Sequence, residues 1–237
     1  MDEPLSGDFN MAADELLLES STVPTLRLYG WAFPCVSLGY SQAVLQSPLP
    51  VVRRPSGGRA LLHDQELTYC IALPQVPPGC SIAQAFEQLT GGLGAALGRL
   101  GIEVSQATRS EPNGQRSTGQ RSSCMSLHQR GELHSSRGKL VGSAQVRRGE
   151  RLLQHGVIPW RVNQELLEAV FPSHPPIWGV EDLGHARFGP LDLAEALGRV
   201  WGIEWSLEPW SLSELASLPL EGDGRGCSIG LGGKVQS

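Results

Sequence analysis

Cys124 and Lys139 lie fifteen positions apart in this 237-residue chain and are the pair best suited to covalent chemistry. A cysteine thiolate accepts acyl groups as thioesters, but a free thiol with a pKa of about 8.5 is mostly protonated at neutral pH. An ammonium group close to the sulfur favours the thiolate by charge pairing. The two residues therefore predict an acyl transferase that works through a thioester on Cys124, with Lys139 stabilising the thiolate.

A second polar tract, residues 53–64, places two glycines between cationic and polar side chains at the start of an apolar run. Glycine lets backbone amides approach a ligand, and cationic neighbours balance negative charge that develops on an acyl carbonyl. Apolar neighbours would hold the acyl chain, at about 0.8 kcal/mol for each buried CH₂ group. The residues expected to bind the acyl substrate here are Arg54, Ser56, Gly57, Gly58 and His63.

Helix formers and turn residues predict the elements that position these side chains. Helices are expected at residues 10–20, 81–100, 163–170, 191–201 and 211–218. Strands are expected at residues 26–29, 35–38, 51–54, 60–62, 67–73, 140–146, 152–158 and 203–207. Ser81 is predicted to cap the long helix, and Gly101 to stop it. The first two strands are expected to be adjacent, and the sixth and seventh to form a hairpin that turns at residues 148–150.

The order of these elements lacks regular βαβ alternation and predicts an α+β domain with helices packed on mixed or antiparallel sheets. The predicted catalytic domain covers residues 1–218, and the glycine-rich residues 219–237 are expected to be a flexible tail. Residues 105–123 are polar without periodicity and are expected to form a mobile loop.

Composition narrows the class of protein. A net charge of −5 argues against a nucleic-acid binder, which needs a basic surface. No apolar run approaches the roughly 20 residues of a bilayer span, so a soluble protein without membrane contact is expected. The five cysteines are odd in number and irregularly spaced, and no signal-like segment opens the chain. A reducing cytoplasm is the expected location.

Three motifs follow one another along the chain. They are NMAADE at residues 10–15, the tract at 53–69 with GGRALLHD and ELTY, and GKLVGSAQ at 138–145 followed by LQHG at 153–156. They resemble the opening helix, the substrate loop and the catalytic-lysine strands of the biotin/lipoate ligase and octanoyltransferase superfamily. The similarity runs from about residue 8 to about residue 218. It implies the fold of the biotin/lipoate ligase catalytic domain.

Within that superfamily the chain resembles the cysteine-dependent octanoyltransferases of lipoate assembly. That branch has Gly-Gly-Arg-Ala, Glu-Leu-Thr-Tyr and a cysteine fifteen residues before the lysine, as found here. Lipoate ligases usually have a third glycine in place of Arg59 and Gly-Asn in place of Glu66-Leu67. The resemblance assigns catalysis to Cys124 and Lys139. It implies further substrate-binding residues at Gly142, Ser143, Ala144 and His155.

The implied reaction moves an octanoyl group from octanoyl-acyl carrier protein to a lysine of a lipoyl domain or of a glycine-cleavage H protein. Thioester exchange changes the free energy little, and amide formation is downhill, so no ATP or other cofactor is expected. Acyl carrier proteins and lipoyl domains are usually acidic, so a local basic patch is expected to bind them. Its candidate residues are Arg109, Arg116, Arg121 and Arg130.

Two alternatives stay open. The chain could be an ATP-dependent lipoate-protein ligase that uses ATP and Mg²⁺, with Cys124 a bystander, or a non-catalytic module that binds an acyl group or a protein partner. Two other patterns are rejected. The glycines of residues 92–97 lack the third glycine of a dinucleotide motif and are expected to pack a helix. Cys124, His128 and His134 match no common zinc spacing, so no metal is expected.

Overall fold

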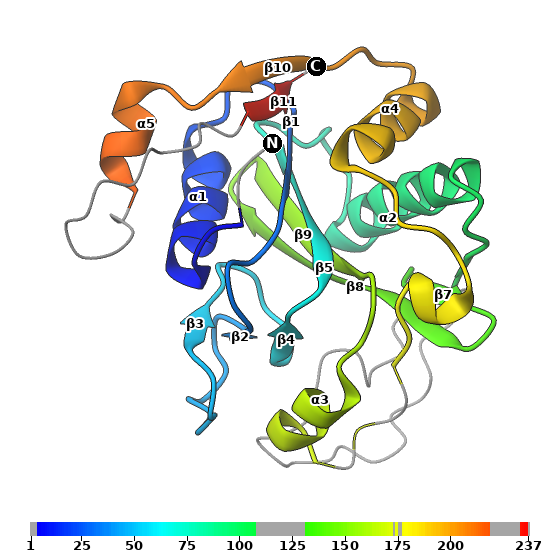
Figure 1. Cartoon of the computed structure of the whole chain (residues 1–237). Coiled ribbons are helices and arrows are strands. Elements are labelled where there is room, and N and C mark those ends of the chain that lie inside the picture. The colour runs from blue at the N-terminus through cyan, green and yellow to red at the C-terminus, as the bar shows by residue number, and fades with distance from the viewer. Residues whose placement is uncertain (1–3, 108–130, 173, 175–176, 219–232, 237) are drawn as a thin grey trace.

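The computed structural model describes residues 4–107, 131–172, 174, 177–218 and 233–236 (Figure 1). The described residues form mixed helices and sheets, which confirms the predicted α+β class. None of the described helices is both long enough and apolar enough to cross a membrane. Cys124 lies outside the described residues, and so do all four arginines of the expected basic patch, Arg109, Arg116, Arg121 and Arg130. The part of the expected loop beyond residue 107 also lies outside them.

The helices are α1 (Gly7–Ser20), α2 (Ile82–Arg99), α3 (Gln164–Val170), α4 (Pro190–Trp201) and α5 (Leu212–Ser217), with a short 3-10 helix, η2 (Glu181–Leu183). The strands are β1 (Thr25–Tyr29), β2 (Cys35–Leu38), β3 (Val51–Arg53), β4 (Leu61–His63), β5 (Glu66–Leu73), β6 (Ser105–Gln106), β7 (Leu133–Ser135), β8 (Gly138–Arg148), β9 (Arg151–Pro159), β10 (Ser206–Pro209) and β11 (Gly233–Gln236).

Within the described residues these strands form two sheets. The large sheet has the order β10-β11-β1-β5-β9-β8-β7-β6, and its neighbouring strands run antiparallel. The small sheet has the order β3-β2-β4, with β2 parallel to β3 and antiparallel to β4. The predicted hairpin is confirmed, because β8 and β9 pair from their turn at Gly149 back to Gly142 and Val157.

The large sheet separates two apolar layers, and the alternation of side chains along β5 explains why. Leu67 and Ile71 point to the core cluster that contains residues of α2 and α4, whereas Cys70 and Ala72 belong to the cluster under α1. Figure 1 shows α2 and α4 on one side of the sheet and α1 on the other. Because both faces are covered, β5 is buried along nearly its whole length.

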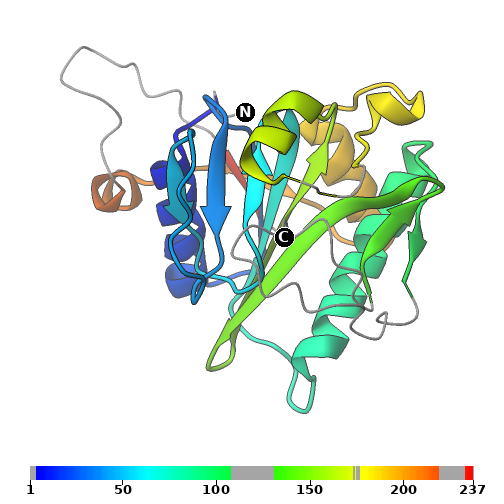
Figure 2. The same ribbon diagram turned by 90° about the horizontal axis from the view of Figure 1, so that it is seen from below.

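The small sheet lies on the α1 side of the large one (Figure 2). Residues of both sheets line the candidate site. Val52 of β3 and Cys35 of β2 pack into the same apolar cluster as Phe9 and Leu17 of α1. Strand β3, which leads into the predicted substrate tract, therefore packs against the opening helix, although 30 residues of chain, 21–50, separate the two.

Local signals placed α2 accurately. Ser81 caps it, with its side chain accepting from the amide of Gln84 while the Gln84 side chain accepts from the amide of Ser81. Gly101 follows the end of the helix at a φ of 81°, a left-handed conformation that favours glycine. A methyl group added at Gly92 would stand 2.2 Å from Nε1 of Trp201, so this glycine lets α2 and α4 pack closely, as expected.

Four expectations differ from the structure. The strands at 26–29 and 35–38 are not adjacent, because β1 belongs to the large sheet and β2 to the small one. Residues 105 and 106, expected to open a loop, form β6. The strand expected at residues 203–207 is β10 at Ser206–Pro209. In the expected tail, residues 233–236 form β11, which pairs with both β1 and β10. Partners distant in sequence create these strands, and local patterns do not reveal such partners.

Candidate functional site

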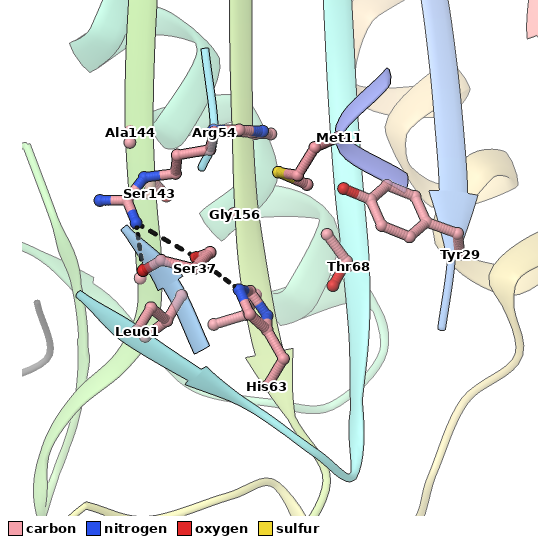
Figure 3. Close-up of a pocket in the computed structure, with 13 residues that line it drawn as sticks. Met11, Tyr29, Ser37, Arg54, Leu61, His63, Thr68, Ser143, Ala144 and Gly156 are labelled. Carbon is pink, nitrogen blue, oxygen red and sulfur yellow. Dashed lines mark hydrogen bonds between the residues drawn. The ribbon is translucent and has the colours of Figure 1, made fainter. Parts of the chain in front are cut away.

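A pocket lies between the small sheet and strands β5, β9 and β8, and Met11 of α1 also lines it (Figure 3). It holds about 350 Å³ of space free of protein atoms, part of it open to solvent. Its lining includes six residues expected to bind substrate: Arg54, His63, Gly142, Ser143, Ala144 and His155. It also includes polar Ser37, Tyr29 and Thr68, and apolar Met11, Leu61 and Val157. The fold thus gathers three separate sequence motifs around one cavity.

Arg54 holds the substrate loop in shape. Its buried guanidinium donates hydrogen bonds to the carbonyl oxygens of Gly57 at 2.9 Å, of Arg59 at 2.6 Å and of Ser37 at 3.0 Å. Gly58 follows at a φ of 93°, which requires glycine or strain. Gly57 and Gly58 are exposed and are not among the residues that line the pocket, so their described role is to form this turn.

His155 belongs to a buried polar cluster on the α1 side of the pocket. Its Nδ1 donates to Oδ2 of Asp14 at 2.8 Å, and its Nε2 lies 2.5 Å from Oγ of Ser56. Asp14 also accepts from Nη1 of Arg27 at 2.9 Å and from the hydroxyl of Tyr29 at 2.8 Å. Ser56, predicted as a binding residue, is fully buried behind the pocket wall, where it contacts His155.

Electrostatics make Asp14 an anion in this cluster. Burial alone would raise the pKa of its carboxyl group, but the hydrogen bond from His155 and the charge of Arg27 outweigh burial and lower it. Arg27 is itself almost completely buried, so the two charges compensate each other. The same environment raises the pKa of the Tyr29 phenol, first through burial and then through the negative charge of Asp14.

His63 belongs to a second polar cluster, on the side of the small sheet. Its Nδ1 lies 2.6 Å from Oε1 of Glu66, and its Nε2 lies 2.7 Å from Oγ of Ser37. Glu66 also accepts from the hydroxyl of Thr68, which in turn accepts from Nε1 of Trp31. The Trp31 ring stacks on His63 with 3.8 Å between ring centroids. This chain of contacts fixes the imidazole in one orientation.

Lys139 is the second residue of β8 and is buried, and it is not among the residues that line the pocket. Its Nζ donates to Oε1 of Glu132 at 2.6 Å, and both side chains are about 97 % or more shielded from solvent. On β8 the pocket lining starts three residues further on, at Gly142. Ser143, in the lining, shares a hydrogen bond of 2.7 Å with the hydroxyl of Tyr69. A fixed positive charge at Lys139 can stabilise a thiolate or the oxygen of a polarised carbonyl.

Sequence reasoning missed the carboxylates that hold these groups. Asp14 and Glu66 stood within recognised motifs, but neither was expected to contact a site residue. A charged residue inside an otherwise apolar helix face or strand is the signal that could have drawn attention to both, because buried carboxylates need partners. Glu132 carried no such signal, since it lies between polar residues and a short strand.

Comparisons with known proteins identify the family of this chain. Residues 6–181 match the family model of the lipoyl protein ligase A/B catalytic domain. The chain is 38% identical to an octanoyltransferase LipM from Kyrpidia tusciae, over 71% of this chain and 68% of that protein. It is 39% identical to the octanoyltransferase LipM of Moorella thermoacetica, over 80% of this chain and 74% of that protein. For the octanoyltransferase LipM of Oceanobacillus iheyensis the identity is 39%, over 71% of this chain and 65% of that protein.

Solved structures share the fold at lower identity. A putative lipoate protein ligase from T. acidophilum with bound lipoic acid superposes with a TM-score of 0.73 at 18% identity, over 92% of this chain and 90% of that one. A lipoate-protein ligase A bound with ATP gives a TM-score of 0.70 at 17% identity, over 92% and 90% of the two chains. The motifs, the arrangement of sheets and the family match agree, and the chain belongs to the lipoyl protein ligase A/B catalytic-domain family.

Proposed function

We propose that this chain is an octanoyltransferase that moves an octanoyl group from octanoyl-acyl carrier protein to a lysine of a lipoyl-accepting protein. The observation that carries the proposal is the identity of 38 to 39% to octanoyltransferases across about seven tenths of the chain or more. The acceptor is a lipoyl domain or a glycine-cleavage H protein. The pocket supports this function, because its wall joins apolar side chains suited to an acyl chain with polar groups suited to its head.

Cys124 carries the acyl group in this proposal. The thiolate sulfur attacks the donor thioester, a new carbon–sulfur bond forms, and the carrier thiol leaves. The acceptor amine then attacks the enzyme thioester, giving an amide and releasing Cys124. The ammonium of Lys139, held by Glu132 at 2.6 Å, supplies the positive charge that favours the thiolate and the polarised carbonyl. Neither step needs ATP or Mg²⁺.

Glu66 supports the transferase over the ligase alternative. It stands where lipoate ligases usually have the glycine of Gly-Asn, and it is buried against His63 and Thr68. The departure from the ligase pattern thus lies directly behind the pocket wall, where Glu66 contacts the lining residues His63 and Thr68. An acidic group there does not favour the phosphates of ATP, because like charges repel in a poorly solvated site.

The test is the intact mass of the purified protein after incubation with octanoyl-acyl carrier protein and no ATP. Wild type is expected to gain one octanoyl group that hydroxylamine removes, and Cys124→Ser is expected to gain none. Cys80→Ser is a matched control, because Cys80 is a free and partly exposed thiol outside the pocket, and it should label like wild type. Labelling of Cys124→Ser, or product formation that requires ATP and lipoate, would overturn the proposal in favour of the ligase.

A further inference from the structure

A second cavity lies beside the first pocket. It holds about 440 Å³ of space free of protein atoms, part of it open to solvent. Its lining comes from β4 and the turn that leads into β5, from the end of β9 and the residues that follow it, and from Leu167 of α3 and Ile177. The proposed transferase has two substrates, and the first pocket accounts only for the acyl group. The second cavity is therefore available to the other substrate.

The two cavities share an apolar wall. Leu61 of β4 and Val157 of β9 line both of them, and both side chains are buried. Figure 3 shows Leu61 below Ser37 at the edge of the first pocket. A ligand that fills the second cavity therefore has one end next to an acyl group held in the first.

The lining of the second cavity changes from apolar to polar toward solvent. Most of its buried side chains are aliphatic and belong to one cluster, which contains Leu61, Val157, Leu167 and Ile177. Its exposed side chains are polar: Gln65, Arg161 and Asn163. This gradient suits a ligand that has an aliphatic stem and enters from an aqueous surface. A lysine side chain, with its four methylene groups and charged end, is such a ligand.

The partly buried carboxylate of Asp64 gives this cavity a place for a cation. Among the residues that the structure describes, no cation and no hydrogen-bond donor contacts the Asp64 side chain. Burial raises the pKa of its carboxyl group, and the negative charge of Glu66 raises it further. Glu66 lines the same cavity, but its carboxylate is already bonded to His63 and Thr68. A cation in the cavity is therefore stabilised most at Asp64.

Building on the proposed function, we propose that the second cavity admits the target lysine of the lipoyl-accepting protein and that the carboxylate of Asp64 binds its ammonium group. A lysine with the usual pKa of about 10.4 is positively charged at pH 7, so it forms a charge-assisted hydrogen bond with an aspartate. The phosphate-bearing arm of an acyl carrier protein suits the cavity less, because the charges of Asp64 and Glu66 repel a phosphate.

Arg161 gives the exposed side of the cavity the opposite charge. Its side chain is 63% exposed, and its Nε lies 3.4 Å from Oε2 of Glu181, a carboxylate that Arg187 binds more closely, at 2.6 Å. Lipoyl domains are usually acidic, so acidic residues around the target lysine complement this guanidinium. A cation toward solvent and a carboxylate further in match a lysine that projects from an acidic surface.

The test is a double-mutant cycle between Asp64 and the target lysine, measured as binding by isothermal titration calorimetry. Asp64→Asn should weaken the binding of an apo lipoyl domain about tenfold, the lower range for a hydrogen bond to a charged group. A lipoyl domain with glutamine in place of the target lysine should bind Asp64→Asn and wild type equally, because it brings no charge to the cavity. Glu103→Gln, which changes an exposed carboxylate outside the cavity, should bind both domains as wild type does. Equal weakening of both domains by Asp64→Asn, or no weakening of either, would overturn the proposal.

A second variant and the donor reaction separate the remaining outcomes. Val162→Trp places a larger side chain in the cavity lining and should also weaken binding of the lysine-bearing domain. Formation of the octanoyl-enzyme by Asp64→Asn, followed by intact mass, should stay within about twofold of wild type, because the donor does not use this cavity. Slower adduct formation with unchanged acceptor binding would assign the cavity to the donor arm and refute the proposal. Failure of wild type to form any adduct would instead refute the proposed function, while the binding cycle still tests the cavity.

Discussion

Replacing Asp14 by alanine should destabilise the fold severely, because three buried donors converge on this carboxylate. Arg27, Tyr29 and His155 donate to it at 2.8 to 2.9 Å, and its own side chain is completely buried. Loss of one partner of a buried ion pair costs roughly 3–5 kcal/mol, since the remaining charge stays in a poorly solvated site. A typical domain has only about 5–15 kcal/mol of stability. Asp14→Ala should therefore lose about a fifth of it or more.

The assay is urea unfolding followed by tryptophan fluorescence, compared with Glu15→Ala on the same helix. Glu15 is about half exposed and pairs with exposed Arg148, so its loss should cost roughly 1 kcal/mol or less. The lowered pKa of Asp14 gives a second signature in Asp14→Asn. The advantage of wild type should be complete above about pH 4, the unfolded pKa, and should shrink as pH falls through the folded pKa. An Asp14→Ala cost within 1 kcal/mol of the Glu15→Ala cost would refute this reasoning.

Two further predictions concern the layer under α2 and α4. Burial raises the pKa of Tyr69 to about 12 despite hydrogen bonds that lower it, so the folded protein should lose roughly 3 kcal/mol as pH rises from about 10 to 12. The free energy of unfolding of Tyr69→Phe, measured across the same pH range, should not show this part of the loss. If the stabilities of wild type and Tyr69→Phe fall in parallel, the raised pKa of Tyr69 is not the cause. Gly92→Ala should lower the melting temperature, because its methyl group would stand 2.2 Å from Trp201. Gly98→Ala on the same helix is the control, because its methyl group meets no neighbour within 4 Å, and it should raise the stability by up to about 1 kcal/mol. Both variants are compared by calorimetry. If Gly92→Ala changes the stability as Gly98→Ala does, helix propensity dominates and the packing argument is wrong.

The sequence by itself determined the elements whose signals are local. The cap at Ser81 and the stop at Gly101 bound α2 correctly, and the β8–β9 hairpin turns where its glycine predicts. Caps, turns and periodicity act over a few residues, so they can be read directly from the chain. The motifs also established the family, although the role of Cys124 is a proposal that rests on its spacing from Lys139.

Only the tertiary structure decided which polar groups meet. His155 contacts Asp14 across 141 positions of sequence and Ser56 across 99, and no spacing rule predicts either distance. The same holds for β11, which becomes a strand because β1 and β10 provide partners on both sides. Burial makes these contacts obligatory, since a carboxylate or imidazole removed from water must find a partner. The sequence contains the groups, and the packing of two sheets against α1 selects the pairs.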